Sequence, residues 1–460
     1  MRISKVILNL VIALALLGVV NAALTFVIEP YGSRSQLAWM DYANQEELDT
    51  ILVGTSYMEY NVDPAVLNED CGYKSYNLGS PSQTIEESFM GIQTAYDDHH
   101  VKRVILGVST GILTSSTPPN PGGAFMRNRS FYVSPMETFR ATNEFLWHYG
   151  AASSANSLHL LFPWASNPVH SVKFNTLYKN VMAKITHADV AAVAEDLESG
   201  WKYQGLGHGT RDKSVNMNGS HIRNINEGVD EDEMADAALP TDSTQIDPDR
   251  ARTLGEICTY CKDRDIELIV IVAPLPVHNI FDENSTYFET MDSIEAFLAE
   301  QGVTVYDFNL ATSDLFESKL TDFADIHHLN VDGAQKFSHA LARFLNMLEA
   351  GEDVDALFTT PEEKYGTIDY LSALFATSEV DADGVHLDWR IVTGPDVDVE
   401  YRVLVKESDA EDYHPVTEWS PDTSFTYLPE QHGKVMFHIC ARKVGSKADY
   451  QRFRPVEELW

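Results

Sequence analysis

The sequence predicts an α/β fold with a parallel sheet, preceded by one apolar helix and followed by a smaller all-β domain. Three observations lead to this prediction: an uncharged apolar run near the amino end, an alternation of short apolar strands with amphipathic helices, and a change to period-two alternation beyond Gly351. The chain has 460 residues, and single cores rarely grow past roughly 250 to 300 residues. We therefore expect more than one folded unit.

The apolar run covers residues 6–28 and contains no charged residue. At about 1.5 Å per residue, a helix of this length reaches roughly 34 Å and can cross the hydrocarbon core of a bilayer. Arg2 and Lys5 precede it, so the positive-inside bias predicts a single-pass signal anchor in the cell membrane, with residues 1–5 in the cytoplasm and the remaining chain outside. The competing interpretation is a cleaved signal peptide with Val20-Asn21-Ala22 as its processing site, which exports the chain equally.

Strands and helices alternate between residues 48 and 350. Short runs that are apolar at every position predict strands, and stretches with helical spacing separate them. Strands of this kind are typical of a parallel sheet covered by helices on both faces. The predicted strands are 50–53, 101–108, 268–272 and 303–306, and the predicted helices are 82–98, 250–263, 291–300 and 332–348.

Three segments fall outside this alternation. Residues 29–47 are predicted as a stem after the apolar run, and residues 351–376 as a linker after the sheet. From about 114 to 249 the pattern degrades into aromatic, glycine-rich and polar stretches, which predicts an insertion at the edge of the sheet or over its site, as a cap. Its last part, 227–249, holds nine acidic residues and no basic one, so we expect a solvated loop there.

Residues 377–460 alternate apolar and polar side chains, as in Val385, Leu387 and Trp389. This alternation predicts half-buried antiparallel strands. Turn signals such as Thr393-Gly394-Pro395 separate the strands. A unit of this size is typical of a small β-sandwich of the fibronectin-III-like kind.

Charge and cysteine content exclude several classes of protein. The formal net charge of -36 repels phosphate backbones, so nucleic acid is not an expected partner. Four cysteines are too few for a disulfide framework. Cys258 and Cys261 form a C-x-x-C, but no second pair completes a zinc ligand set. Their helical spacing with Leu254 and Ile257 predicts buried core cysteines, and we predict no metal site.

Ser56 follows the first predicted strand directly, in Gly54-Thr55-Ser56. A hydroxyl at this place lies at the carboxyl edge of a parallel sheet, where open α/β folds place their binding sites. The alternative role for Ser56 is to cap a following helix. Asp325 and His328 lie three residues apart before the last predicted helix. They can supply an imidazole that takes the serine proton and a carboxylate that orients the imidazole.

Three further residues bear on this chemistry. His327 would be the base if the loop turned differently, and Asp322 is a second candidate for the acid. Gly79 follows the next strand end after the serine, in Tyr76-Asn77-Leu78-Gly79. Because a glycine lets the backbone approach a ligand closely, its N–H can complete an oxyanion hole together with the N–H of Ser56.

Together and in this order, these segments resemble the SGNH (GDSL-like) hydrolase superfamily, particularly its membrane-anchored cell-envelope branch. That branch includes proteins similar to the D-alanyl transfer protein of teichoic acid modification and to alginate O-acetylation proteins. The resemblance covers residues 50–348 except the insertion, and its most specific part is the D-x-x-H-L-N-x-x-G-A segment that begins at Asp325. It implies a flavodoxin-like three-layer fold.

The resemblance also implies the roles of individual residues. Ser56 would be the nucleophile, His328 the general base and Asp325 its orienting acid, with the N–H groups of Ser56 and Gly79 forming the oxyanion hole. One block departs from the family pattern. The third strand end reads Gly107-Val108-Ser109-Thr110-Gly111, where the family has Gly-x-Asn-Asp, so the third oxyanion donor is missing or comes from elsewhere.

The activity implied is that of an extracytoplasmic serine esterase or O-acyltransferase. It would act on ester-linked acyl groups of a cell-envelope glycan or polymer through an acyl-serine intermediate. Expected partners are that acylated polymer, the membrane through the N-terminal helix, and a membrane-bound acyl-donor protein. No cofactor is expected, because side chains and N–H groups suffice. The alternative is a catalytically inactive SGNH-like surface protein that binds glycan or an assembly partner. The missing asparagine favours it, and the complete Ser, His and Asp set disfavours it.

Overall fold

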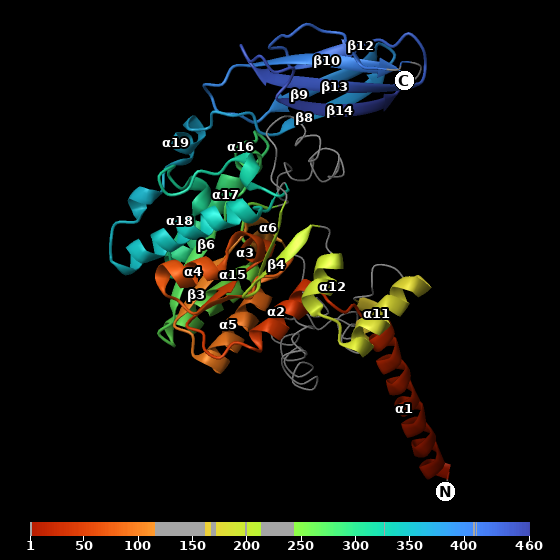
Figure 1. Ribbon diagram of the computed structural model, residues 1–460, viewed down its shortest axis with the longest axis vertical. Coiled ribbons are helices and arrows are strands. Elements are labelled where there is room, and N and C mark those ends of the chain that lie inside the picture. The colour runs from red at the N-terminus through yellow and green to blue at the C-terminus, as the bar shows by residue number, and fades with distance from the viewer. Residues whose placement is uncertain are drawn as a thin grey trace.

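The structure is a computed structural model with an α/β domain between a projecting N-terminal helix and a C-terminal β domain (Figure 1). The two ends of the chain lie at opposite ends of the molecule. The described residues are 2–115, 162–166, 172–197, 200–212, 243–325, 327–407, 410 and 412–460.

Helix α1 (Arg2–Ile28) projects from the α/β domain (Figure 1). Its segment Lys5–Ile28 is long and apolar enough to span a membrane. After a short connection, α2 (Arg34–Tyr42) packs into the domain with Trp39 and Tyr42 buried. The prediction of a stem over residues 29–47 is therefore wrong in its central part, because the aromatic side chains of α2 form part of the apolar core.

The central sheet has five parallel strands in the order β2-β1-β3-β6-β7. Numbered by themselves in chain order, these strands follow the order 2-1-3-4-5, which is a common order of doubly wound sheets. The four predicted strands are present, and β2 is added at the edge. The strands are β1 (Thr50–Val53), β2 (Ser75–Asn77), β3 (Arg103–Gly107), β6 (Glu267–Val272) and β7 (Val305–Asp307).

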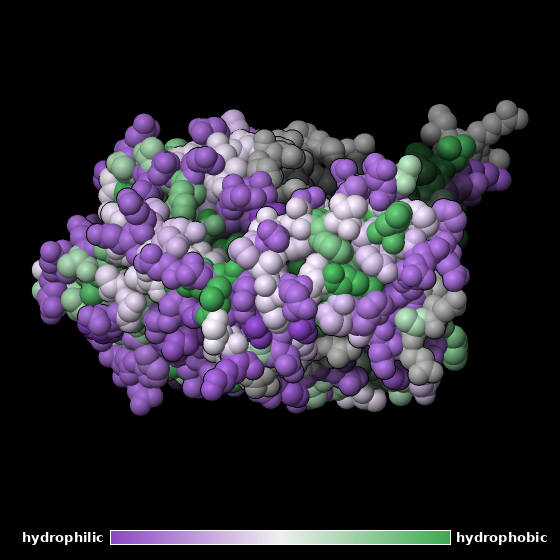
Figure 2. Space-filling model, turned by 90° about the horizontal axis from the view of Figure 1, so that it is seen from above, coloured by the Kyte–Doolittle hydropathy of each residue, from purple (hydrophilic) through white to green (hydrophobic). Residues whose placement is uncertain are grey.

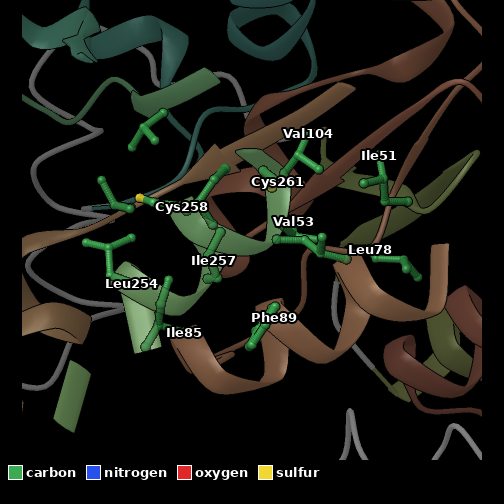
Figure 3. Packing of buried hydrophobic residues seen from close by; sticks show 14 of the residues in the cluster. Ile51, Val53, Leu78, Ile85, Phe89, Val104, Leu254, Ile257, Cys258 and Cys261 are labelled. Atoms are coloured by element: carbon green, nitrogen blue, oxygen red, sulfur yellow. The ribbon is translucent and has the colours of Figure 1, made fainter. Parts of the chain in front are cut away.

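Helices cover both faces of the sheet. On one face, Val53 and Val104 of the sheet belong to the same buried cluster as Phe89 of α5 and Ile257 of α15 (Figure 3). On the other face, the strands pack against α3, α4 and α18. Strand residues buried on both faces explain the continuous apolar runs in the sequence. The helices are α3 (Ser56–Asn61), α4 (Pro64–Cys71), α5 (Ile85–His99), α15 (Pro248–Lys262), α16 (His278–Phe281), α17 (Tyr287–Glu300) and α18 (Val331–Glu349).

Cys258 and Cys261 lie on the buried side of α15 as free thiols (Figure 3). Both belong to the core cluster between α15 and the sheet, so the prediction of core cysteines is confirmed. Burial raises the pKa of Cys258 to about 11 and that of Cys261 to about 12. Both side chains therefore behave as small apolar groups.

The described residues include only parts of the predicted insertion. Its end overlaps α15, and most of its acidic stretch 227–249 lies outside the described residues. A two-stranded hairpin, β4–β5, returns from the insertion to the α/β domain and lies against α3. The described elements between β3 and α15 are α6 (Thr110–Thr114), α10 (Pro163–Ser166), α11 (Phe174–Thr186), α12 (Val190–Leu197), β4 (Trp201–Gly205) and β5 (His208–Arg211).

The C-terminal strands form two antiparallel sheets, β12-β9-β8 and β11-β10-β13-β14. They share one buried cluster that includes Leu387, Val403 and Phe437. Strand β8 begins at Leu374, within the predicted linker. The guanidinium of Arg390 donates to both carboxylate oxygens of the buried Asp282, which joins this domain to the loop after α16.

Among the described residues after α18, the structure has one short α-helix, α19 (Pro361–Gly366), and seven strands: β8 (Leu374–Asp381), β9 (Gly384–Ile391), β10 (Val399–Glu407), β11 (His414–Pro415), β12 (Ser424–Tyr427), β13 (Lys434–Lys443) and β14 (Arg452–Leu459). Short 3₁₀ helices occupy Phe308–Leu310, Leu320–Asp322 and Asp355–Leu357.

Candidate active site

A cavity of about 390 Å³ opens at the carboxyl ends of β1, β3 and β6. The chain leaves β1 toward β2 on one side and leaves β3 toward β6 on the other, so β1 and β3 form the switch point of the sheet. Open α/β sheets bind ligands in the crevice at this point. The cavity is lined by Thr55, Ser56, Tyr57, Ser82, Val108, Ser109, Thr110, Gly111, Ile112, Val272, Ala273, Leu275, Tyr287, His327 and His328.

Ser56 is the first residue of α3, directly after the turn that ends β1. Gly54 in this turn has a φ of +148°, and a Cβ there would meet the Gly107 carbonyl oxygen at 2.6 Å, so the turn requires glycine. Thr55 caps the helix, because its hydroxyl accepts a hydrogen bond from the Tyr57 N–H. The capping role considered for Ser56 therefore falls to its neighbour.

Ser56, His328 and Asp325 form one chain of hydrogen bonds. The Nε2 atom of His328 lies 2.9 Å from the Ser56 hydroxyl oxygen. On the other side of the ring, Nδ1 lies 3.0 Å from Oδ1 of Asp325. The structure thus brings together three residues that are 272 and 3 positions apart in the sequence, in the arrangement of a serine–histidine–acid triad.

The loop before α18 fixes the backbone around this triad. The Ala324 N–H donates to the His328 carbonyl at 2.8 Å, which closes the loop. Asn330 caps α18 by accepting from the Gly333 N–H, and its amide donates to the Thr321 carbonyl. A Cβ on Gly333 would meet the Asp322 carbonyl oxygen at 2.1 Å. The asparagine and the glycine of the motif are therefore required by the tight entry into the helix.

Asp325 accepts hydrogen bonds from its own loop as well as from the imidazole. The N–H groups of His327 and His328 donate to Oδ1 at 2.9 and 2.8 Å. Burial alone would raise the pKa of this carboxyl, but the His328 ring and the two N–H donors hold it well below its ordinary value. Asp325 is therefore an anion at neutral pH and can orient and stabilise a protonated His328.

The two alternative residues occupy other positions. Burial and the neighbouring His328 lower the pKa of His327 to about 4. Its ring contacts Tyr57 edge-on in the cavity wall, and its place in the hydrogen-bond chain is taken by His328. The Asp322 carboxylate accepts from the Lys319 N–H at 2.9 Å and from the Lys336 ammonium at 3.0 Å. It stabilises the loop, whereas Asp325 faces the imidazole.

Gly79 does not take the position predicted for it. Its N–H donates to Oδ1 of Asn77 at 2.9 Å, and the Asn77 amide donates to the carbonyls of Met58 and Val62. A Cβ on Gly79 would meet the Glu59 nitrogen at 2.9 Å. This glycine allows the chain after β2 to pack closely against α3, and its N–H is used inside that contact, not in an oxyanion hole.

The third strand end supplies backbone to the cavity where the asparagine of the family pattern is missing. Ser109, Thr110 and Gly111 all line the cavity, and Thr110 is the first residue of α6. The first N–H groups of a helix have no intrahelical acceptor. The N–H of Ser56 at the start of α3 is of the same kind, and no acceptor for it occurs among the residues that the structure describes.

Two further residues, which the sequence did not indicate, contact the triad. Arg211, at the end of β5, donates to Oδ2 of Asp325 at 3.2 Å. The Tyr60 ring of α3 lies against the His328 ring with centroids 4.4 Å apart. Tyr60 has no local signal, and Arg211 lies 114 residues before its partner. Within the described ranges, no group of three or more His, Cys, Asp and Glu side chains is placed to hold a metal ion.

No family model matches the sequence, and no curated protein matches it. Among solved structures, the chain is similar to an engineered protein at 10% sequence identity, with 94% of this chain and 96% of that chain covered and a TM-score of 0.14. It is also similar to β-glucosidase 3B from Thermotoga neapolitana in complex with α-D-glucose, at 11% identity, with 90% of this chain and 76% of that chain covered and a TM-score of 0.13. TM-scores this low carry no argument about fold or function.

Proposed function

We propose that the protein is a serine esterase or O-acyltransferase of the SGNH type that acts outside the cytoplasm. The observation that carries this proposal is the hydrogen-bond chain from Ser56 through His328 to Asp325, at the switch point of a parallel sheet. The ester-linked acyl groups of a cell-envelope glycan or polymer are the proposed substrates, because α1 would hold the domain beside the membrane.

The geometry supports a two-step acyl transfer. The Ser56 hydroxyl attacks the ester carbonyl while Nε2 of His328 takes its proton, and Asp325 stabilises the resulting imidazolium. When the tetrahedral intermediate collapses, the ester bond breaks and His328 returns the proton to the leaving alcohol. Water or an acceptor hydroxyl then attacks the acyl-serine while His328 takes its proton. The bond between the acyl group and the Ser56 oxygen breaks, and His328 returns the proton to that oxygen.

The oxyanion that forms in both steps needs N–H donors. We assign one donor to the Ser56 N–H and a second to the first turn of α6, at Thr110 or Gly111. This assignment replaces the Gly79 N–H, which is bonded to Asn77. The third strand end would thus contribute backbone donors where the family pattern has an asparagine side chain.

The cavity wall supports an acyl group as the reacting part of the substrate. Val108, Ile112, Val272 and Leu275 give it an apolar side next to Ser56. An apolar wall favours an acyl chain over a charged group. Whether water or a second hydroxyl completes the reaction depends on how well a bound substrate excludes water.

Labelling of the full chain in detergent with a fluorophosphonate probe tests this function. We expect covalent labelling of wild type and its loss in Ser56→Ala, because only an activated serine reacts. Ser82→Ala is the matched control, since Ser82 also lines the cavity and lies outside the hydrogen-bond chain. Wild type that is folded but fails to label would contradict the proposal and favour the binding-protein alternative.

A further inference from the structure

Helix α11 (Phe174–Thr186) exposes a stripe of apolar side chains. Phe174 is 83% exposed, Tyr178 54% and Ile185 58%. With the partly buried Val181, these residues follow the spacing i, i+4, i+7 and i+11, so they lie on one side of the helix. Val172, 69% exposed, precedes the helix. Large apolar side chains exposed together in this way mark a contact surface.

The flank of α11 that carries Asn180 and Lys184 is fixed to the carboxyl end of α1. The Asn180 amide donates to the carbonyls of Val27 and Glu29 at 2.9 Å, and its Oδ1 accepts from the Tyr31 N–H. The Lys184 ammonium donates to the carbonyls of Phe26 and Glu29. These bonds satisfy carbonyls that a helix end leaves without intrahelical donors. They hold α11 beside the last turn of α1, as Figure 1 shows.

The number of residues in α1 shows where this contact lies relative to the hydrocarbon core of a bilayer. A hydrocarbon core of roughly 30 Å takes about 20 helical residues, so a span that begins at Lys5 leaves the core near Leu24. The bonds from α11 fall on Phe26 to Glu29, just beyond that point. One turn deeper, the indole N–H of Trp164 donates to the Asn21 side chain at 2.8 Å. Tryptophan is enriched at this depth of membrane proteins.

We propose that α11 lies in the interface of the lipid bilayer, with its apolar stripe among the acyl chains of the outer leaflet. The stripe is continuous with the lipid-facing surface of α1, and an interfacial helix typically buries its apolar face about 5–10 Å into this boundary. Lys179 lies away from the stripe and is exposed, where it can reach lipid headgroups. The bilayer contact would fix the orientation of the domain, because α11 and α1 then hold it at two points.

The rest of the surface offers a contrast. The end of the molecule away from α1, seen in Figure 2, is mostly hydrophilic, with apolar residues scattered across it. Leu428 and Val444, in the β domain, are 62% and 58% exposed. They provide exposed apolar positions that no bilayer reaches under this proposal.

Photolabelling from within the bilayer tests the proposal on the full chain, reconstituted in phosphatidylcholine vesicles with a hydrophobic diazirine and mapped by mass spectrometry. We expect residues 172–186 to carry on the order of tenfold more label per residue than the segments around Leu428 and Val444, because the probe partitions into hydrocarbon. Label in α1 shows that the span itself is inserted. Equal labelling of 172–186 and the β-domain segments, with α1 labelled, would overturn the proposal.

A matched pair of variants separates lipid contact from general exposure. The double variant Phe174→Asp and Ile185→Asp places charges on the stripe, whereas Asn175→Asp places a charge on the exposed polar side of the same helix. We expect label in 172–186 to fall to the level of the β domain in the double variant and to stay at the wild-type level in Asn175→Asp. Retained label in the double variant would contradict burial of the stripe in lipid.

Discussion

Two regions hold Asp325, and they do so by different means. The loop of residues 322–330 does it locally, through N–H groups two and three positions along the chain from the carboxylate. The β4–β5 hairpin, which is distant in the sequence, holds it through the guanidinium of Arg211. The hairpin also bonds to this loop through the Thr210 hydroxyl, which donates to the Leu329 carbonyl at 3.0 Å.

The geometry of the triad should therefore depend strongly on the loop and only weakly on the hairpin. The loop sets the position of the imidazole and the carboxylate together, so any change in it alters both. On Asp325 itself, Arg211 of the hairpin donates to Oδ2, which also lies 3.1 Å from Nδ1 of His328. The effects of substitutions on the rate of fluorophosphonate labelling should therefore differ between the two regions by several orders of magnitude. Three experiments measure that difference.

The largest effect is expected for His328. Removal of the base in His328→Ala should lower the rate of fluorophosphonate labelling on the order of 10⁴-fold or more, because Ser56 then keeps its proton. The neighbouring His327→Ala is the matched control, and it should change the rate less than about tenfold, since His327 lies in the wall of the cavity. Equal losses in the two variants would mean that both imidazoles share the role of base.

Asp325→Asn should give the next largest effect, about 10³- to 10⁴-fold on the same rate, because the amide no longer stabilises the imidazolium. The pH dependence of stability should change as well. The pKa of Asp325 is lowered in the folded state, so its ionised form contributes stability that is present above about pH 4 and is lost as the pH falls through the folded-state pKa.

Thermal unfolding of the full chain in detergent measures this second effect. The difference in Tm between wild type and Asp325→Asn should narrow as the pH falls below about 4. A difference that stays constant across this range would show that the hydrogen bonds to Asp325 do not favour its ionised form.

The smallest effect is expected for the hairpin. Arg211→Gln should lower the labelling rate by about five- to tenfold, because one partly buried charged hydrogen bond is lost. The pH midpoint of the rate should move upward, since loss of a nearby cation favours the protonated form of the base. Lys202→Gln is the matched control, as its exposed ammonium pairs with Glu195 on the surface.

A drop in rate without a shift of the pH profile in Arg211→Gln would show that the guanidinium only supports the loop. A fall in the labelling rate as large as that of Asp325→Asn would show that the hairpin matters as much to the triad as the loop does.

The sequence predicted what depends on neighbouring residues. The apolar strand 50–53 has the bounds of β1, and the helices 82–98 and 250–263 lie within a few residues of α5 and α15. The catalytic roles of Ser56, His328 and Asp325 came from the resemblance and stay a prediction, but the pairing of Asp325 with His328 also follows from neighbouring residues, since both lie in one short loop. These features rest on periodicity and local spacing, which a single sequence shows directly.

Other features depend on residues distant in the sequence, and the sequence did not show them. The role predicted for Gly79 was wrong because the Asn77 side chain takes its N–H, which follows only from the packing of β2 against α3. Arg211 reaches Asp325 because the hairpin folds back across α3. The prediction of a stem over residues 29–47 failed because α2 is too short to show a clear helical periodicity in the sequence. The burial of Trp39 follows only from its packing in the tertiary core.

The short connection between α1 and α2 limits how far the α/β domain can lie from the end of α1. Only residues 29–33 separate the two helices, and five residues span at most about 17 Å when extended. An α1 embedded in a bilayer would therefore keep the start of α2, and with it the α/β domain, in a layer close to the lipid surface. Under the proposed function, substrates in that layer would meet the site at a high effective concentration.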